Sequence, residues 1–297
     1  ILRDWSSDVC SSDLKYVKIL SVILSVVLIG ASFAGCASES EEAGAITDST
    51  MLIAYTEEAE PFLYTDENGN LTGFDAELVA ATFDSFKGDF TDYQFVKVDE
   101  GYRLGEDTAY TDDEGNEYHA IIYCASHKDK GTMNEDYNWS SDIIQNDVVT
   151  VVPASSTIKN YNDLAGARAG IVSEAAANAL SENTSVLNAL ASAHQYASAD
   201  EAFAALNAGS IDAVVIDDFS LYKFDGYANY TVLNGALDTI EYGFAFAKSN
   251  DYSSGFNEAV LEISSTDYSD EDTLTPLVEK YFGSADVLVF DYQPEEQ

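Results

Sequence analysis

The feature that most constrains the fold is an alternation of short apolar segments with segments of helical period, which runs from Met51 to about Phe282. Apolar runs of strand length separated by amphipathic helices are typical of a layered α/β protein, in which helices cover the faces of a sheet. The chain has 297 residues, enough for two lobes or for one large domain with a substantial core. The pattern therefore predicts the α/β fold class.

In the first half, the pattern predicts three strands and one long helix. The strands are expected over 51–55, 94–98 and 119–124, and the helix from Phe74 to near Lys87. Asn68-Gly69 lies between two apolar segments and predicts a tight hairpin turn in which both central residues have positive φ. A long acidic loop is expected over 99–118.

In the second half, predicted strands and helices again alternate. Strands are expected over 147–153, 169–172, 211–218 and 241–248, and helices from Asn160 and over 173–190, 199–209, 254–264 and 274–282. The strand over 211–218 ends on two aspartates, and Asp218 is the better candidate for the N-cap of a helix that begins near Phe219. The second half therefore shows the same alternation of strands and helices as the first half.

The N-terminal segment predicts export and attachment to a membrane. Residues 1–14 resemble a translated sequencing adapter and are left out of the fold prediction. Residues 15–35 combine two lysines with an apolar run, which is typical of a secretion signal. Small residues precede Cys36 in a pattern that resembles the bacterial lipobox, so Cys36 is the expected lipidation site and 36–50 an acidic, flexible tether. An uncleaved membrane anchor is the alternative interpretation.

Charge and cysteine content narrow the function classes. The chain carries 53 acidic and 13 basic residues, for a formal charge of −40. This charge repels nucleic acid and anionic surfaces, so neither is an expected partner. Cys10 lies in the adapter-like segment and Cys36 at the lipid site, which leaves Cys124 without a disulfide partner.

Several segments, taken in order, resemble the extracellular solute-binding proteins of amino-acid ABC transporters, the family 3 group. They are EPFLYTDENGNLTGFDAELVAATF, YNWSSDIIQNDVVTVVP, IKNYNDLAGARAGIV, ADEAFAALNAGSIDAVVIDD and EYGFAFAKSN, followed by a helix that ends LVEKYFG. The resemblance implies a two-lobed type II periplasmic binding protein fold, each lobe a sheet flanked by helices, with two hinge strands. Lobe one would span 51–146 and 247–283, lobe two 147–246, and a tail 284–297.

The resemblance also implies a solute site between the lobes. Asp217 takes the position of the aspartate that binds the solute ammonium, with an N-cap role as its alternative. The family's carboxylate-binding arginine is missing, because Met133 stands at its position, and the alternative donors are Lys128 or Lys130 as a point charge, or Arg103. The full set of expected solute-binding residues is Thr56, Phe62, Tyr102, Arg103, Ser126, His127, Ser173 and Asp217.

The function expected from this resemblance is solute binding without catalysis. A small polar solute, either an amino acid or an amino-acid-like or cationic compound, would close the lobes and pass to an ABC permease and its ATPase. The protein would act as a monomer on the outer face of the cell membrane, with no cofactor or metal. The alternatives are a cyclohexadienyl or arogenate dehydratase-like enzyme on the same fold, and a tethered sensor or adhesin. A metal site from His119, His127 and Cys124 has unfavourable spacing.

Overall fold

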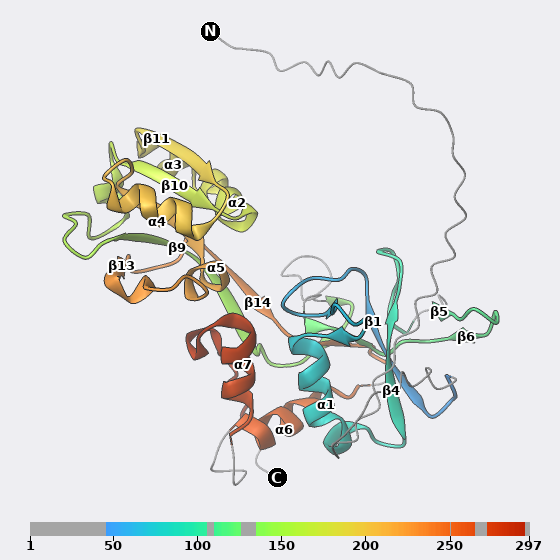
Figure 1. Cartoon of the computed structure of the whole chain (residues 1–297). Coiled ribbons are helices and arrows are strands. Elements are labelled where there is room, and N and C mark those ends of the chain that lie inside the picture. Colours follow the sequence, from blue (N-terminus) through green and yellow to red (C-terminus); the bar gives the residue numbers. More distant parts are fainter. Residues whose placement is uncertain (1–45, 106–109, 126–134, 250, 265–271, 295–297) are drawn as a thin grey trace, which may run out of the picture.

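The fold consists of two β-sheets, each with its own helices, joined by two long strands (Figure 1). The computed structural model describes residues 46–105, 110–125, 135–249, 251–264 and 272–294. We call the sheet that contains β1, with its helices, lobe one, and the sheet that contains β10, with its helices, lobe two. The mixed α/β architecture confirms the predicted fold class.

Lobe one is built on a five-stranded sheet. In sheet order its strands are β4 (Asp92–Lys97), β1 (Thr50–Tyr55), β7 (Ile122–Tyr123), β15 (Ala245–Phe246) and β8 (Asn138–Trp139). β1 runs parallel to β4 and β7, whereas β15 runs antiparallel to both of its neighbours. The helices of this lobe are α1 (Phe74–Phe86), α6 (Ser253–Ser264) and α7 (Leu274–Phe282). Two hairpins complete it, β2 (Tyr64–Thr65) with β3 (Leu71–Thr72), and β5 (Tyr110–Thr111) with β6 (Glu117–Tyr118).

Lobe two is built on a larger sheet. Its strands are β11 (Ser192–Tyr196), β10 (Arg168–Val172), β12 (Ala213–Asp217), β9 (Ile144–Pro153), β13 (Tyr230–Val232) and β14 (Asp238–Tyr242). β10 lies between β11 and β12, and all three run parallel. The helices are α2 (Glu174–Glu182), α3 (Thr184–Ala189), α4 (Ala199–Asn207) and α5 (Asp218–Tyr222). The 3-10 helices within the described residues of both lobes are η3 (Tyr161–Leu164), η4 (Tyr227–Asn229) and η5 (Ala285–Val287). β12 is buried along its whole length, as expected of a central strand covered on both faces.

The two lobes are connected by β9 and β14, which pair antiparallel from Asp238 opposite Val148 to Tyr242 opposite Ile144. After Tyr242 the chain leaves the lobe-two sheet, and two residues later it enters the lobe-one sheet as β15. The C-terminal segment lies along the same crossing, because the amide of Val289 donates to the carbonyl of Ile143. These pairings form the two predicted crossing strands.

An aromatic cluster fills the junction of the lobes. Phe62, Phe219, Tyr242 and Phe282 have ring centroids between 4.6 and 6.0 Å apart in five pairs. Although α5 begins in the lobe-two sheet, its Phe219 is part of the lobe-one core. The end of α5 also touches the end of α7, since a Cβ at Gly283 would lie 2.8 Å from the carbonyl oxygen of Tyr222. The lobes therefore share a packed apolar pivot.

Tertiary pairing changes several predicted elements. The strand expected over 241–248 is divided between β14 and β15, because its halves belong to different sheets. The helix expected over 173–190 breaks at Asn183, whose side-chain amide donates to the carbonyls of Ala179 and Leu237. Of the strand expected over 119–124, only Ile122–Tyr123 forms a regular strand, β7, and β8, β11 and β13 were not predicted. The acidic loop over 99–118 contains the β5–β6 hairpin.

The turn between β2 and β3 also differs from the prediction. Gly69 has φ +85°, whereas among described non-glycine residues only Ser173 has a positive φ, so Asn68 does not. The loop is organised instead by Asp66, whose Oδ1 accepts the amides of Asn68 at 2.9 Å and Asn70 at 2.8 Å. The hairpin prediction is confirmed and its turn type was wrong.

Candidate functional site

A hollow of about 400 Å³ lies at the carboxyl ends of the parallel strands of lobe two. In an open α/β sheet this edge is where ligands bind, because the loops and helix starts that follow the strands converge there. The hollow is lined by Val172, Ser173, Ala197, Ser198, Ala199, Asp200, Ser220, Lys223, Phe224 and Asp225. We call it the lobe-two hollow.

The polar wall of the lobe-two hollow is set by helix starts. Ser173 is the N-cap of α2, and its hydroxyl accepts the amide of Ala176 at 3.2 Å. Its φ of +85° with ψ of 158° is a conformation that a residue with a side chain rarely adopts. Ser198 caps α4 in the same way through the amide of Glu201. Two helix N-termini therefore open at this edge.

A second hollow, of about 340 Å³, lies where lobe two meets lobe one. Its lining residues are Glu60, Pro61, Tyr64, Thr72, Glu77, Lys223, Lys280 and Tyr281. Apart from Lys223, all of them belong to lobe one, and Lys223 is also the residue that this hollow shares with the lobe-two hollow. We call it the junction hollow. The two hollows are thus neighbours on either side of one lysine.

Asp217 lies at the end of β12 and is 5% exposed. It is the N-cap of α5, so the sequence-based preference for Asp218 as the cap was wrong. Its carboxylate accepts the amide of Ser220 at 3.1 Å, the hydroxyl of Ser220 at 2.9 Å and the side-chain amide of Asn146 at 3.4 Å. The N-cap alternative thus describes what Asp217 does here, and its binding of a solute ammonium stays a prediction.

Asn146 connects this cap to the crossing strand β9. It is 6% exposed, and its side-chain oxygen accepts the amide of Phe219 at 3.2 Å while its amide donates to Asp217. A single side chain of β9 thereby holds both the end of β12 and the start of α5. The geometry of the lobe-two edge is therefore tied to the crossing strands.

Asp218 carries the most perturbed carboxyl of this region. Burial, the nearby carboxylate of Asp147 and those of Asp217 and Asp286 raise its pKa to about 7. The backbone amide of Asp147 donates to Asp218 and opposes this shift. Because these groups come from β9, β12 and η5, the start of α5 concentrates negative charge at the crossing.

The other predicted residues of lobe one line neither hollow. Thr56 is half-buried directly after β1, and Phe62 is buried in the aromatic cluster of the junction. Tyr102 is a core residue, since its hydroxyl accepts the amide of Ala120 at 2.9 Å and its carbonyl accepts the hydroxyl of Tyr123 at 2.7 Å. Arg103 is half-buried and donates to the carbonyl of Tyr102 at 3.3 Å. Their roles in solute binding stay predictions.

Three predicted positions lie outside the described residues. They are Ser126 and His127, which were expected to bind solute, and Cys36, the expected lipidation site. Met133, at the position of the missing arginine, lies there too. Of the described residues predicted for the site, Ser173 alone lines one of the two hollows.

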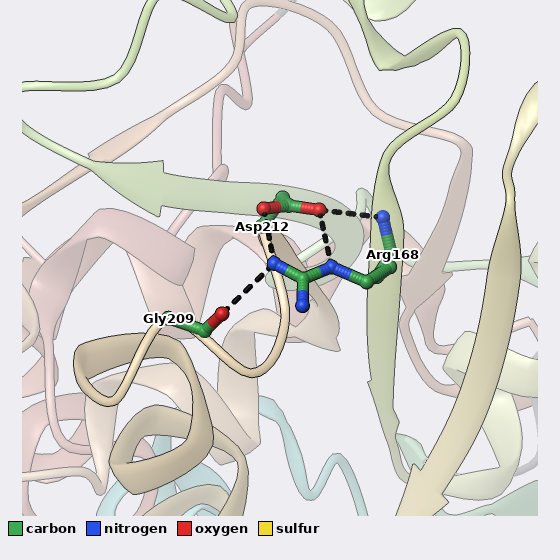
Figure 2. Close-up of polar contacts among 3 residues, drawn as sticks. All are labelled: Arg168, Gly209 and Asp212. Carbon is green, nitrogen blue, oxygen red and sulfur yellow. Dashed lines mark hydrogen bonds and ion pairs between the residues drawn. The ribbon is translucent and has the colours of Figure 1, made fainter.

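Arg168 lies at the opposite end of β10 from Ser173 and is committed to a structural contact (Figure 2). Its guanidinium donates from Nε to one oxygen of Asp212 at 2.9 Å and from Nη2 to the other at 2.8 Å. Nη2 also donates to the carbonyl of Gly209 at 2.8 Å. The Asp212 hydrogen bonds raise the pKa of Arg168 and lower that of the carboxyl. The arginine therefore fastens the turn before β12 to β10.

Cys124 and His119 do not form a common site. Cys124 is fully buried, and burial together with Asp75 raises the pKa of its thiol well above the ordinary value, whereas His119 is exposed. Within the described ranges, no group of three or more histidine, cysteine, aspartate or glutamate side chains is arranged to hold a metal ion. Over the same ranges, the helices are too short or too polar to cross a bilayer.

Several solved structures are similar to this chain over about four-fifths of its length. The chain is similar to a polar amino acid ABC uptake transporter substrate binding protein from Streptococcus thermophilus, with a TM-score of 0.61 and 18% identity over 82% of this chain and 89% of that one. The fold is that of a two-lobed periplasmic binding protein. The L-cystine solute receptor of Neisseria gonorrhoeae, in its unliganded open conformation, has the same fold, with a TM-score of 0.55 and 17% identity over 81% and 95% of the two chains.

A third structure of the same periplasmic binding protein fold is substrate binding domain 2 of Lactococcus lactis GlnP in an open conformation. The TM-score is 0.53 and the identity 16%, over 81% of this chain and 98% of that one. No protein-family model and no curated protein matches the sequence. Since one fold hosts many functions, the fold alone does not assign a function to this chain.

The residues that sequence reasoning missed are the charged ones of the hollows. Lys223, Asp200 and Asp225 line the lobe-two hollow, and Lys223 reaches the junction hollow as well. Ser198 before an acidic first turn marked a helix start, but that signal does not place a residue at a ligand site. Lys223 follows a short helix whose end is brought to lobe one only by tertiary packing.

Proposed function

We propose that this protein is an extracytoplasmic solute-binding protein that delivers a small polar solute to an ABC importer. The observation that carries the proposal is the pair of hollows, which share Lys223 beside the contact between α5 of lobe two and the end of α7 of lobe one. A solute held there would contact both lobes, so its binding would favour whichever arrangement brings them together. The names of the structurally similar proteins support an amino acid or amino-acid-like solute.

The hollows have the size and lining that a small polar solute requires. Volumes of about 340 and 400 Å³ are at the lower end of ligand sites, and carboxylates, hydroxyls and a lysine supply the polar contacts. The lobes are connected by two strands and an apolar pivot, which allows a hinge rotation without loss of the core. The proposed mechanism is capture by closure of the lobes, followed by docking on the permease.

We expect one class of solute to stabilise the purified protein. At a concentration of about 100 times Kd a ligand stabilises by about 2.7 kcal/mol, which corresponds to a rise in Tm of about 5 °C or more in a protein of this size. Thermal unfolding should be followed with a panel of amino acids, polyamines and betaines, and X-ray scattering should show contraction with the solute that binds. A panel without any shift would instead favour the sensor or adhesin alternative, and turnover of arogenate would favour the enzyme.

We also propose that Cys36 carries the lipid that holds the protein on the outer face of the membrane. The basis is the apolar run that precedes it and the acidic segment that follows. Cys36→Ala is expected to shift most of the protein from the membrane fraction to the medium and to abolish incorporation of labelled palmitate. The matched control is Cys124→Ala, which changes a thiol buried inside the fold. Membrane retention of the Cys36→Ala protein would argue for an uncleaved anchor.

A further inference from the structure

We propose that Lys223 binds the anionic group of the solute, and that the solute is a zwitterion whose carboxylate lies at Lys223 and whose ammonium lies against Asp200 and Asp225. This inference rests on the proposed function and specifies its ligand. It gives a single lysine of lobe two the role of the family's arginine, which is missing from this chain.

Lys223 occupies the boundary between the hollows. It is exposed at the C-cap of α5, next to the contact between Tyr222 and Gly283 that brings α5 against α7 of lobe one. In the lobe-two hollow it is the one basic residue of the lining, and in the junction hollow it is the one residue from lobe two. A solute that spans the two hollows therefore passes the side chain of Lys223.

The basic side chains of Lys280, Arg168 and Arg103 either form ion pairs with carboxylates or lie outside the two hollows. Lys280, in the junction hollow, forms an ion pair with Glu77 at 2.6 Å, and this carboxylate raises the pKa of the lysine. The hydroxyl of Tyr281 donates to the same carboxylate oxygen, at 2.6 Å. Arg168 is bound to Asp212, and Arg103 lines neither hollow. Lys223 differs from them, because no hydrogen bond or ion pair joins its ammonium to any residue of the described segments.

The charge around Lys223 favours a zwitterion over an anion or a polycation. Asp200 and Asp225 share the lobe-two hollow with it, and Glu60 and Glu77 share the junction hollow. A purely anionic solute would meet these carboxylates in a chain whose formal charge is −40. A purely cationic solute would face Lys223 itself. A zwitterionic solute avoids both repulsions, because its carboxylate would face the ammonium of Lys223 and its ammonium would face the carboxylates of Asp200 and Asp225.

The test compares an acid with its amide in two variants. Calorimetric titration is run with the best-binding amino acid of the panel and with its carboxamide, on the wild type, Lys223→Met and Lys223→Arg. Lys223→Met is expected to weaken the amino acid about 10-fold or more and to leave the carboxamide within about twofold, whereas Lys223→Arg keeps amino-acid binding within about threefold. Lys159→Met is the matched control, since Lys159 is exposed in the same lobe and lines neither hollow, and it should change nothing.

Each contrary result has a separate meaning. Equal weakening of acid and amide by Lys223→Met, with unchanged Tm, would overturn the assignment, as would no weakening at all. Binding of polyamines but not of amino acids would overturn the zwitterion while leaving solute binding intact. If no solute binds the wild type, the proposed function itself fails and the role of Lys223 fails with it.

Discussion

Replacing Phe282 with alanine is expected to lower the free energy of unfolding by about 3–5 kcal/mol, the usual cost of removing a fully buried aromatic ring. Phe282 is 0% exposed, and its ring lies 4.6 Å from that of Phe219, 5.1 Å from Phe74 and 5.5 Å from Phe62. Truncation would leave a cavity at the point where α7 of lobe one meets α5 of lobe two. Urea unfolding, followed by tryptophan fluorescence and by circular dichroism, measures the loss.

Two further variants separate the role of the pivot from that of general apolar content. Phe282→Leu keeps most of the volume and should cost less than half as much. Val232→Ala removes methyl groups from a side chain that is 43% exposed, and it should cost less than about 0.5 kcal/mol. Because the ring contacts both lobes, Phe282→Ala is also expected to separate the unfolding transitions of the two lobes. A loss below about 1 kcal/mol would show that the cluster does not hold the junction.

Replacing Asp218 with asparagine is expected to stabilise the protein above neutral pH and to remove part of its pH dependence. The pKa of Asp218 is about 7 in the folded protein, against an ordinary value of 3.8. Below the ordinary pKa, both folded and unfolded states are protonated. As pH rises from about 4 to about 7, the unfolded state ionises first and is stabilised relative to the folded state, so the wild type loses stability across this window. Above about pH 7 both states are ionised and the loss is complete.

The rise of the Asp218 pKa from 3.8 to about 7 corresponds to a loss on the order of 4 kcal/mol. The asparagine side chain of the Asp218→Asn variant does not titrate, and its oxygen can still accept the amide of Asp147. The stability difference between variant and wild type should therefore grow from about pH 4 to about pH 7 and then stay constant, as measured by urea unfolding at each pH. Asp225→Asn, which makes the same replacement at an exposed position of the same lobe, is the matched control. A difference that does not change with pH across this window would contradict the prediction.

The local sequence predicted the elements that can be recognised from their own pattern of apolar residues. α1, α6 and α7 were expected within a few residues of their observed bounds, because each has an apolar stripe of helical period that packs on lobe one. β12 was expected because a continuous apolar run followed by two aspartates marks a buried strand and a helix start. β8 and β13, with two and three residues, have no such periodicity, and they are strands only because β15 and β9 pair with them.

The site was less predictable than the fold. Ser173 was expected at the solute from the family resemblance, and it lines the lobe-two hollow. Phe62 and Tyr102 were expected at the solute, but both are buried, one in the junction cluster and the other in the lobe-one core. The sequence does not distinguish an aromatic side chain that packs in a core from one that lines a cleft, because an apolar ring is suited to both places.

By itself, the sequence determined the α/β class, most helices and the acidic character of the molecule, because periodicity and charge are local properties. Only the tertiary structure decided where within 241–248 the chain leaves one sheet and enters the other, and that Asp217 rather than Asp218 is the cap of α5. It also decided that Lys223 stands between two hollows. The physical reason is that each of these depends on contacts between residues distant in the chain, and no local pattern encodes which distant partner a backbone strand or a charged side chain will meet.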